Sequence, residues 1–184
     1  MSNTPTFFPP ETSRPILGVS QCLLGSRVRY DGECKSCPAV TEHLASRFEL
    51  VAVCPEVEAG FSVPRPPVQL STDIVAPRMT GRDNPTLDVT EQILEYTRRK
   101  LEQLTHLDGY VFKSRSPSCG LNSTPVFIDG HCVSDTSRGL FAREFCRRFP
   151  DLPVIEERAL ESVDQRRAFI DRVQLHHRTR QQET

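Results

Sequence analysis

Residues 107–120 read LDGYVFKSRSPSCG, a short apolar run that passes into a polar turn in which Cys119 stands between a serine and a glycine. Two other segments have the same arrangement. PILGVS (15–20) precedes a loop that begins with Gln-Cys, and FELVAVCPE (48–56) ends at a Cys-Pro pair. Short runs of Val, Ile, Leu and Phe bounded by glycine or proline are typical of strands buried on both faces. The sequence therefore predicts three buried strands, each followed within a few residues by a cysteine.

Helical patterns separate these strands. Residues 37–48, 87–106 and 137–149 each repeat apolar side chains at helical spacing. Residues 125–133 predict a hairpin because Asp-Gly lies between apolar triplets, and residues 152–157 predict a last short strand. This alternation indicates an α/β fold: a single domain with an open, mostly parallel, Rossmann-like sheet flanked by helices, together with a small hairpin. In such sheets ligands bind beyond the carboxyl ends of the strands.

The chain has 184 residues, which is enough for one domain with its own core. We expect a flexible N-terminal arm over residues 1–14, one domain over residues 15–157, and an arginine-rich C-terminal tail over residues 158–184. No apolar stretch is long enough to span a membrane, and the first residues lack the basic start and apolar core of a secretion signal. We therefore expect a cytoplasmic protein, and the net charge of −1 indicates no DNA or membrane partner.

Seven cysteines in a reducing compartment do not suggest a disulfide framework. Cys22, Cys54 and Cys119 follow the three predicted strands, and they meet in one crevice if those strands are neighbours. Three thiolates can hold three irons of a 4Fe–4S cluster and leave the fourth iron without a protein ligand. An open coordination position is what a Lewis-acid site needs. From spacing alone, cysteines that merely fill the core are an equally good explanation.

The segments SQCLLGSRVRYDG, VAVCPEVEAGFSVPRPP, MTGRD and KSRSPSCG occur in the order seen in TudS-type thiouracil desulfidases, which the chain resembles from about residue 15 to 157. The resemblance implies a 4Fe–4S cluster held by Cys22, Cys54 and Cys119, with the fourth iron open to the sulfur of the substrate. It also implies a non-redox hydrolysis that converts a thiolated uracil to uracil and hydrogen sulfide. The substrate is then 4-thiouridine in tRNA, or thiouracil or 4-thiouridine as a free base, nucleoside or nucleotide.

The same resemblance assigns roles to polar residues near the cysteines. Glu56 matches the acid/base glutamate of the family, and a carboxylate two residues from a cluster ligand can take a proton from water. Ser116 matches a serine that can donate to the ring or to a developing anion. Asp31, Arg65 and Ser118 are candidates for binding substrate, and arginine suits a phosphate or ring oxygen. Taken without the resemblance, these residues are explained as well by helix starts, turns and a rigid loop.

Two alternative functions remain open from the sequence. Cys34 and Cys37 form a C-x-x-C pair, which a dithiol redox protein or a zinc-binding protein could use, although no second ligand pair follows at the usual spacing. The basic tail could contact an RNA backbone in a non-catalytic accessory protein, or it could be a solvated helix. We expect Cys132 and Cys146 to be packing residues.

Overall fold

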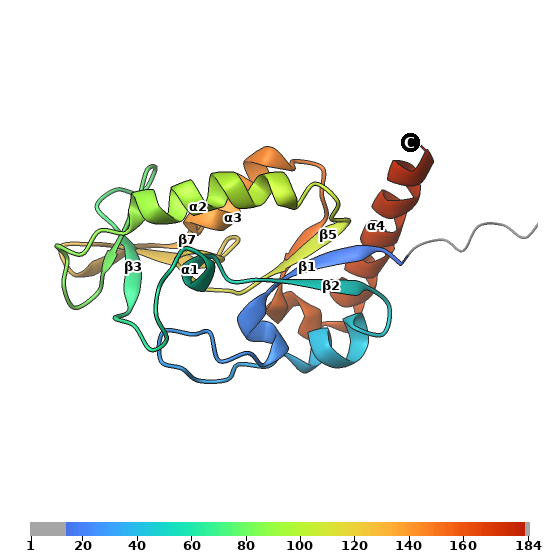
Figure 1. Cartoon of the computed structure of the whole chain (residues 1–184), viewed down its shortest axis with the longest axis horizontal. Coiled ribbons are helices and arrows are strands. Elements are labelled where there is room, and N and C mark those ends of the chain that lie inside the picture. The colour runs from blue at the N-terminus through green and yellow to red at the C-terminus, as the bar shows by residue number, and fades with distance from the viewer. Residues whose placement is uncertain (1–13, 183–184) are drawn as a thin grey trace, which may run out of the picture.

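The computed structural model describes residues 14–182, so most of the predicted N-terminal arm lies outside the described residues. Its centre is a parallel four-stranded sheet, sheet A (Figure 1). The strand order is β2 (Glu49–Val53), β1 (Ile16–Ser20), β5 (Gly109–Phe112) and β8 (Val154–Glu156). The expectation of a parallel α/β sheet is therefore confirmed, and the three cysteine-terminated strands are direct neighbours.

Both faces of sheet A are covered, which explains the apolar runs of its strands. On one face, α2 (Thr90–Gln103) and α3 (Leu140–Arg148) pack against Tyr110 and Phe112 of β5. The rings of Tyr110 and Phe112 lie 4.2 Å apart between their centroids. On the other face lie η2 (Ala39–Leu44), η3 (Glu157–Glu161) and α4 (Val163–Gln182), whose apolar residues pack with Val111 of the same strand. The helix expected over residues 37–48 is shortened to a π-type turn, in which Ala45 N–H bonds the Val40 carbonyl.

A second sheet, sheet B, was not predicted from the sequence. It has the order β4 (Arg78–Gly81), β3 (Val68–Ser71), β6 (Thr124–Ile128) and β7 (His131–Ser137). The expected hairpin is the β6–β7 pair, and its turn residues Asp129 and Gly130 have φ of 50° and 78°, as a type I′ turn requires. Helix α2 joins the two sheets, because Ile93 packs in the sheet B core while Tyr96 and Leu101 pack in the core of sheet A.

The predicted tail is largely the docked helix α4, whose Phe169 and Val173 are fully buried. Its C-terminal half is held by Asp108, a carboxylate with 0% exposure that accepts the Ile16 N–H at 2.8 Å. Asp108 also pairs with His177 at 2.9 Å and Arg180 at 3.0 Å. These contacts place the end of α4 at the amino ends of β1 and β5. No helix in the described part of the chain is long and apolar enough to cross a membrane.

Candidate active site

A cavity of about 510 Å³ opens beyond the carboxyl ends of β2, β1 and β5, and β3 and β6 of sheet B form its opposite wall. From β1 the chain adds β2 on one side of the sheet and β5 on the other, so the direction of strand addition reverses at β1. Such a position is the usual ligand site of an open α/β sheet. The crevice expected from the sequence is therefore present, but its second wall comes from the sheet that the sequence did not reveal.

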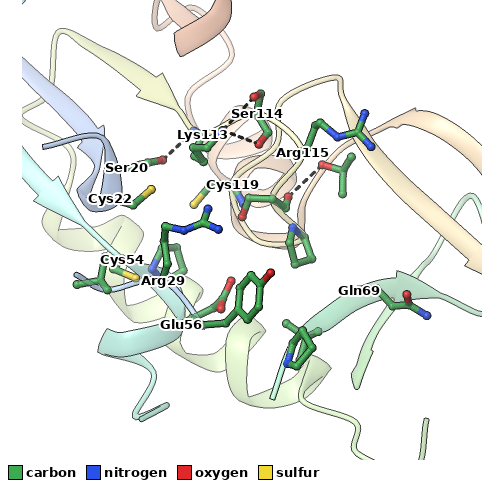
Figure 2. A pocket seen from close by; sticks show the side chains of 18 of the residues that line it. Ser20, Cys22, Arg29, Cys54, Glu56, Gln69, Lys113, Ser114, Arg115 and Cys119 are labelled. Atoms are coloured by element: carbon green, nitrogen blue, oxygen red, sulfur yellow. Dashed lines mark hydrogen bonds between the residues drawn. The ribbon is translucent and has the colours of Figure 1, made fainter. Parts of the chain in front are cut away.

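Cys22, Cys54 and Cys119 all line this cavity (Figure 2). Cys22 lies in η1 (Gln21–Leu24), the helical turn that follows β1. Cys54 follows β2 and is the N-cap residue of α1 (Pro55–Glu58), and Cys119 lies in the loop after β5. The three thiols are brought together because parallel neighbours end at the same edge of the sheet.

Cys119 is buried, Cys22 and Cys54 are half-buried, and the three thiols lie within electrostatic reach of one another. Burial, and next the neighbouring Cys54 thiol, raise the pKa of Cys22 to about 12. Burial raises the pKa of Cys54 and places the pKa of Cys119 well above its usual range; the other two thiols raise the Cys119 value further. Such thiols keep their protons in the absence of a cation, and coordination to a metal removes them. The donor set therefore fits an iron–sulfur group.

This geometry does not fit a single bound ion. Within residues 14–182, no three His, Cys, Asp or Glu side chains are arranged to hold one metal ion. In a cluster each cysteine binds a different iron, so the three thiols need not converge on one point. Within the described residues, the three thiols therefore fit a cluster better than a single compact ion site.

The turn around Cys119 is built by its own backbone and by α3. The Ser116 hydroxyl accepts the N–H groups of Ser118 at 3.3 Å and Cys119 at 3.0 Å, and the Ser116 carbonyl accepts the Gly120 N–H at 2.8 Å. Gly139, before α3, lies so close that a Cβ there would be 2.5 Å from the Ser118 backbone. Ser116 thus lines the cavity, as expected, and also caps the turn that presents Cys119.

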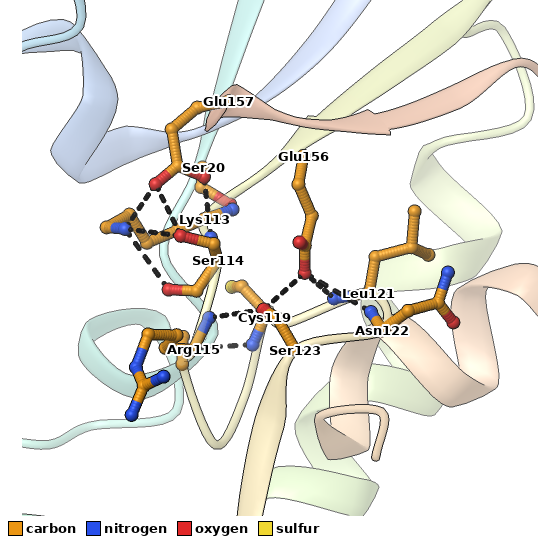
Figure 3. A network of polar contacts seen from close by, with 11 residues as sticks. Ser20, Lys113, Ser114, Arg115, Cys119, Leu121, Asn122, Ser123, Glu156 and Glu157 are labelled. Carbon is orange, nitrogen blue, oxygen red and sulfur yellow. Dashed lines mark hydrogen bonds and ion pairs between the residues drawn. The ribbon is translucent and has the colours of Figure 1, made fainter. Parts of the chain in front are cut away.

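Two carboxylates at the end of β8 hold the rest of this loop (Figure 3). Glu156 accepts the Leu121 N–H and the Ser123 hydroxyl, both at 2.7 Å. Glu157 accepts the N–H of Ser114 at 2.6 Å and its hydroxyl at 2.7 Å, and it pairs with Lys113. No local pattern in the sequence indicates these contacts, because the partners are separated by more than thirty residues.

Glu56 points into the cavity in an orientation fixed from both sides. Arg65 donates from Nε at 2.9 Å and from Nη2 at 2.7 Å to Oε2 of Glu56, while Ser118 donates its hydroxyl to Oε1 at 2.7 Å. Arg65 also donates to the carbonyls of Val28 and Ser62. Arg65 and Ser118 therefore both bind the Glu56 carboxylate, and Arg65 also binds neighbouring backbone carbonyls.

The other predicted substrate residues lie further from the cavity. Ser118 is 1% exposed, and neither it nor Asp31 is among the residues that line the cavity. Asp31 pairs at 2.6 Å with Arg29, which does line it. Direct contact of Asp31 or Ser118 with substrate stays a prediction, and the observed contacts give both a supporting position instead.

The remaining cysteines form no second site in the described chain. Cys34 is exposed and donates its thiol to the Gly25 carbonyl at 3.3 Å, while Cys37 is half-buried against the core beneath η1 and η2. No third ligand joins them in residues 14–182. Cys146 packs against the aromatic core as expected. The same expectation is wrong for Cys132, which is exposed because it lies on β7, the edge strand of sheet B.

The cavity is strongly cationic. Among the described residues that line it, Glu56 is the one carboxylate, and seven carry positive charge: Arg29, Lys35, Arg65, Arg82, Lys113, Arg115 and Arg158. Arg115 has a φ of +59°, a left-handed conformation that is costly for a residue with a side chain and is often found at functional sites. An anionic ligand is therefore favoured.

Comparison with known proteins identifies the family of the chain. Residues 17–157 match the model of the 2-thiouracil desulfurase family. The chain therefore belongs to this family and is an enzyme of the thiouracil desulfidase class that its sequence motifs indicated. It is 30% identical over 108 residues to the uncharacterized protein YbbK of Bacillus subtilis (strain 168), which covers 55% of this chain and 71% of YbbK. The solved structure of TudS, a 4Fe–4S-dependent thiouracil desulfidase, is similar with a TM-score of 0.62 and 28% identity, covering 80% of this chain and 93% of that one.

Proposed function

We propose that the protein removes sulfur from a thiolated uracil with a 4Fe–4S cluster held by Cys22, Cys54 and Cys119, the fourth iron having no protein ligand. The observation that carries the proposal is the position of these three thiols on one cavity together with Glu56. The family match and the similarity to TudS support the thiouracil reaction and the cluster. The reaction is a hydrolysis: a thiocarbonyl and water give a carbonyl and hydrogen sulfide, with no net oxidation or reduction.

The chain supplies proton transfer and orientation. When bound, the cluster would provide a soft Lewis acid for the thiocarbonyl sulfur, which makes the attached ring carbon more electrophilic. Glu56 accepts the proton of the attacking water and passes it to the departing sulfur. Arg65 and Ser118 hold the carboxylate in position for this transfer. Ser116 accepts two N–H groups, so its own hydrogen remains to be donated to the substrate ring.

The charge of the cavity supports a substrate that carries phosphate. In residues 14–182, Lys35, Arg115 and Arg158 have no ion-pair partner although they line the cavity. A 4-thiouridine nucleotide, free or within tRNA, would use these charges, whereas a free thiouracil base would not. The His177 and Arg180 side chains of α4 pair with Asp108 at the amino ends of the strands, which is the end opposite the cavity.

We place the reaction in the cytoplasm, where seven free cysteines stay reduced.

The cluster is tested by anaerobic purification and reconstitution. We expect iron and acid-labile sulfide in the unaltered protein, and loss of both when Cys22, Cys54 or Cys119 is replaced by alanine. Cys132→Ala is the matched control and should keep the cluster, because that thiol is exposed on β7. A cluster retained in any of the three ligand variants would contradict the assignment of that cysteine.

The proton-transfer role and the substrate class are tested by measuring sulfide release. Glu56→Gln should keep the cluster and slow turnover roughly 10²–10⁴-fold. Among thiolated tRNA, 4-thiouridine monophosphate and free thiouracil, a phosphate-bearing compound should have the lowest KM. Arg115→Gln should raise the KM for the monophosphate and leave that for the unphosphorylated nucleoside unchanged. Equal effects on both compounds would argue against phosphate recognition by Arg115.

A further inference from the structure

The two faces of sheet B differ in what they contact. On one face, Leu70 and Val126 are fully buried and pack in one cluster with Ile93 of α2. Side chains alternate between the faces along a strand, so Gln69 of β3 and Phe127 of β6 point the other way, and both line the cavity. Figure 2 shows Gln69 on the side of the cavity away from the three thiols. The second face of sheet B is therefore a wall of the proposed active site.

The core does not account for the aromatic side chain on this wall. Phe127 is half-buried, and among the described residues it is not one of those that form or pack against the three apolar clusters. Its ring instead faces a cavity whose charged lining residues are nearly all cationic. An aromatic ring on a sheet beside cationic side chains is a common binding site for single-stranded nucleic acids, because every base can stack on the ring.

Gln69 places hydrogen-bonding groups next to this ring. Ser71, two residues after Gln69, is aligned with Phe127 in the parallel β3–β6 pair, so Gln69 and Phe127 are diagonal neighbours on adjacent strands. The Gln69 amide makes no hydrogen bond with another described residue, whereas the Ser71 hydroxyl on the same face bonds that of Thr80 at 2.8 Å. An amide offers both a donor and an acceptor, which can pair with the edge of a base.

Gln69 and Phe127, which we call the outer subsite, lie apart from the reactive end of the cavity. Strand β6 begins at Thr124, whose hydroxyl donates at 3.1 Å to the Ser116 carbonyl in the turn that presents Cys119. Phe127 is three residues further along the strand, a distance of about 10 Å at roughly 3.3 Å per residue. The ribose and phosphate of a nucleotide bound at the thiols cannot stack on a ring. The outer subsite is therefore suited to a second base.

Arg115 lies between the two ends of the cavity. It is in the loop that follows β5, and its backbone N–H donates to the Ser123 hydroxyl at 2.7 Å, directly before β6. Its side chain is exposed and lines the cavity. A guanidinium group suits a phosphate oxygen pair, and contacts to phosphate fix the position of a nucleic-acid strand. Arg115 is thus placed to hold the phosphate that joins two nucleotides.

We propose that the outer subsite binds the base of the nucleotide next to the thiolated one, so that the preferred substrate is an RNA strand containing thiolated uridine. This inference rests on the proposed function, because it requires a thiolated uridine at the thiols. Phe127 stacks on the neighbouring base, Gln69 bonds the edge of that base, and Arg115 contacts the phosphate between the two nucleotides. Since stacking accepts any base, the subsite adds affinity with little dependence on the neighbouring sequence.

The test measures sulfide release by the reconstituted protein from dinucleotides of 4-thiouridine and uridine, in both orders. Each is compared with a counterpart that lacks the uracil base of the second residue and keeps its ribose and phosphate. For the better of the two orders, we expect kcat/KM to be about 10-fold higher with the second base than without it. This ratio isolates the contribution of the neighbouring base from that of the phosphate.

Variants then assign the contribution to the subsite. Phe127→Ala should lower the ratio to about 1, Phe127→Tyr should keep it because the ring remains, and Gln69→Ala should lower it about 3-fold. Val133→Ala is the matched control and should keep the ratio, because Val133 is 43% exposed on β7 and does not line the cavity. If Phe127→Ala fails to fold in thermal unfolding, Phe127→Leu replaces it, since leucine keeps apolar volume without a ring.

A ratio near 1 in the unaltered protein would overturn this inference and leave the proposed function standing. A fall in kcat/KM of the Phe127 variant that is equal for both compounds would also overturn it, because the ring would then contact the thiolated base. Absence of sulfide release from every compound by the unaltered protein would refute the proposed function instead. The two failures are therefore distinguishable.

Discussion

The Glu56–Arg65 contact has a counterpart of similar geometry on the surface, against which the effect of burial can be compared. Arg65 donates from Nε and Nη2 to one oxygen of Glu56 at 2.9 and 2.7 Å. Arg147 donates from the same two atoms to one oxygen of Glu144 at 3.1 and 2.6 Å. The side chain of Arg65 is 7% exposed and that of Arg147 is 79% exposed. The two pairs share this geometry and differ in their contact with water and in the bonds that Arg65 also donates to the Val28 and Ser62 carbonyls.

Arg65→Ala leaves the Glu56 carboxylate, which is 12% exposed, without its cationic partner. Removing one member of a buried pair costs about 3–5 kcal/mol, because the remaining charge stays desolvated. The cavity admits some water to Glu56, so we expect a loss of about 3 kcal/mol, at the lower end of that range. Arg147→Ala breaks an exposed pair and should cost about 0–1 kcal/mol.

The measurement is urea unfolding of the cluster-free protein near neutral pH, followed by circular dichroism. The double variant Glu56→Gln/Arg65→Ala should recover part of the loss, since no unpaired charge then remains. If Arg65→Ala costs no more than Arg147→Ala, the burial argument is refuted. The Glu56 carboxylate would then be hydrated well enough to need no cationic partner.

Three other predictions concern separate parts of the molecule. Gly139→Ala should lower stability by about 1–3 kcal/mol in thermal unfolding, because its Cβ would lie 2.5 Å from neighbouring backbone; an unchanged midpoint would contradict this. Burial raises the pKa of Asp88, but hydrogen bonds, the largest contribution coming from Arg78, lower that pKa to about 2. Because this value is below that of the unfolded chain, stability should fall as pH drops from about 4 toward 2, and Asp88→Asn should weaken that dependence in acid titrations of unfolding. Glu156→Gln should cost about 1–3 kcal/mol and speed cluster loss, measured by urea unfolding and chelation; a change in neither would show that the loop is held elsewhere.

Much of sheet A could be predicted because its strands carry their own signal. Residues 15–20, 48–53 and 107–112 are apolar runs bounded by turns, and burial on both faces gives strands that composition. Strands β3 and β4 of sheet B have no such signal, unlike the predicted β6–β7 hairpin. Strand β3 reads VQLS and β4 reads RMTG, and these short, mixed segments are strands because they pair with each other and with β6. That pairing depends on tertiary contacts, which no local pattern reports.

The site was predictable to the same extent as the strands that carry it. Cys22, Cys54 and Cys119 could be grouped because neighbouring parallel strands end together, and the family motifs pointed to Glu56. The carboxylates of Glu156 and Glu157 could not be found, since glutamate at the end of a short strand has no distinguishing pattern. Their role follows from partners that the fold brings from a distant part of the chain.

The dependence of the Cys119 loop on β8 has a consequence for how the protein is made. Cys22 and Cys54 are synthesised before Cys119. The Cys119 loop gains its carboxylate anchors only after Glu156 and Glu157 have been synthesised and β8 has joined the edge of sheet A. Until then the Cys119 loop lacks these two anchors. Under the proposed function, a cluster bound by all three thiols would therefore form only after Glu156 and Glu157 have been synthesised.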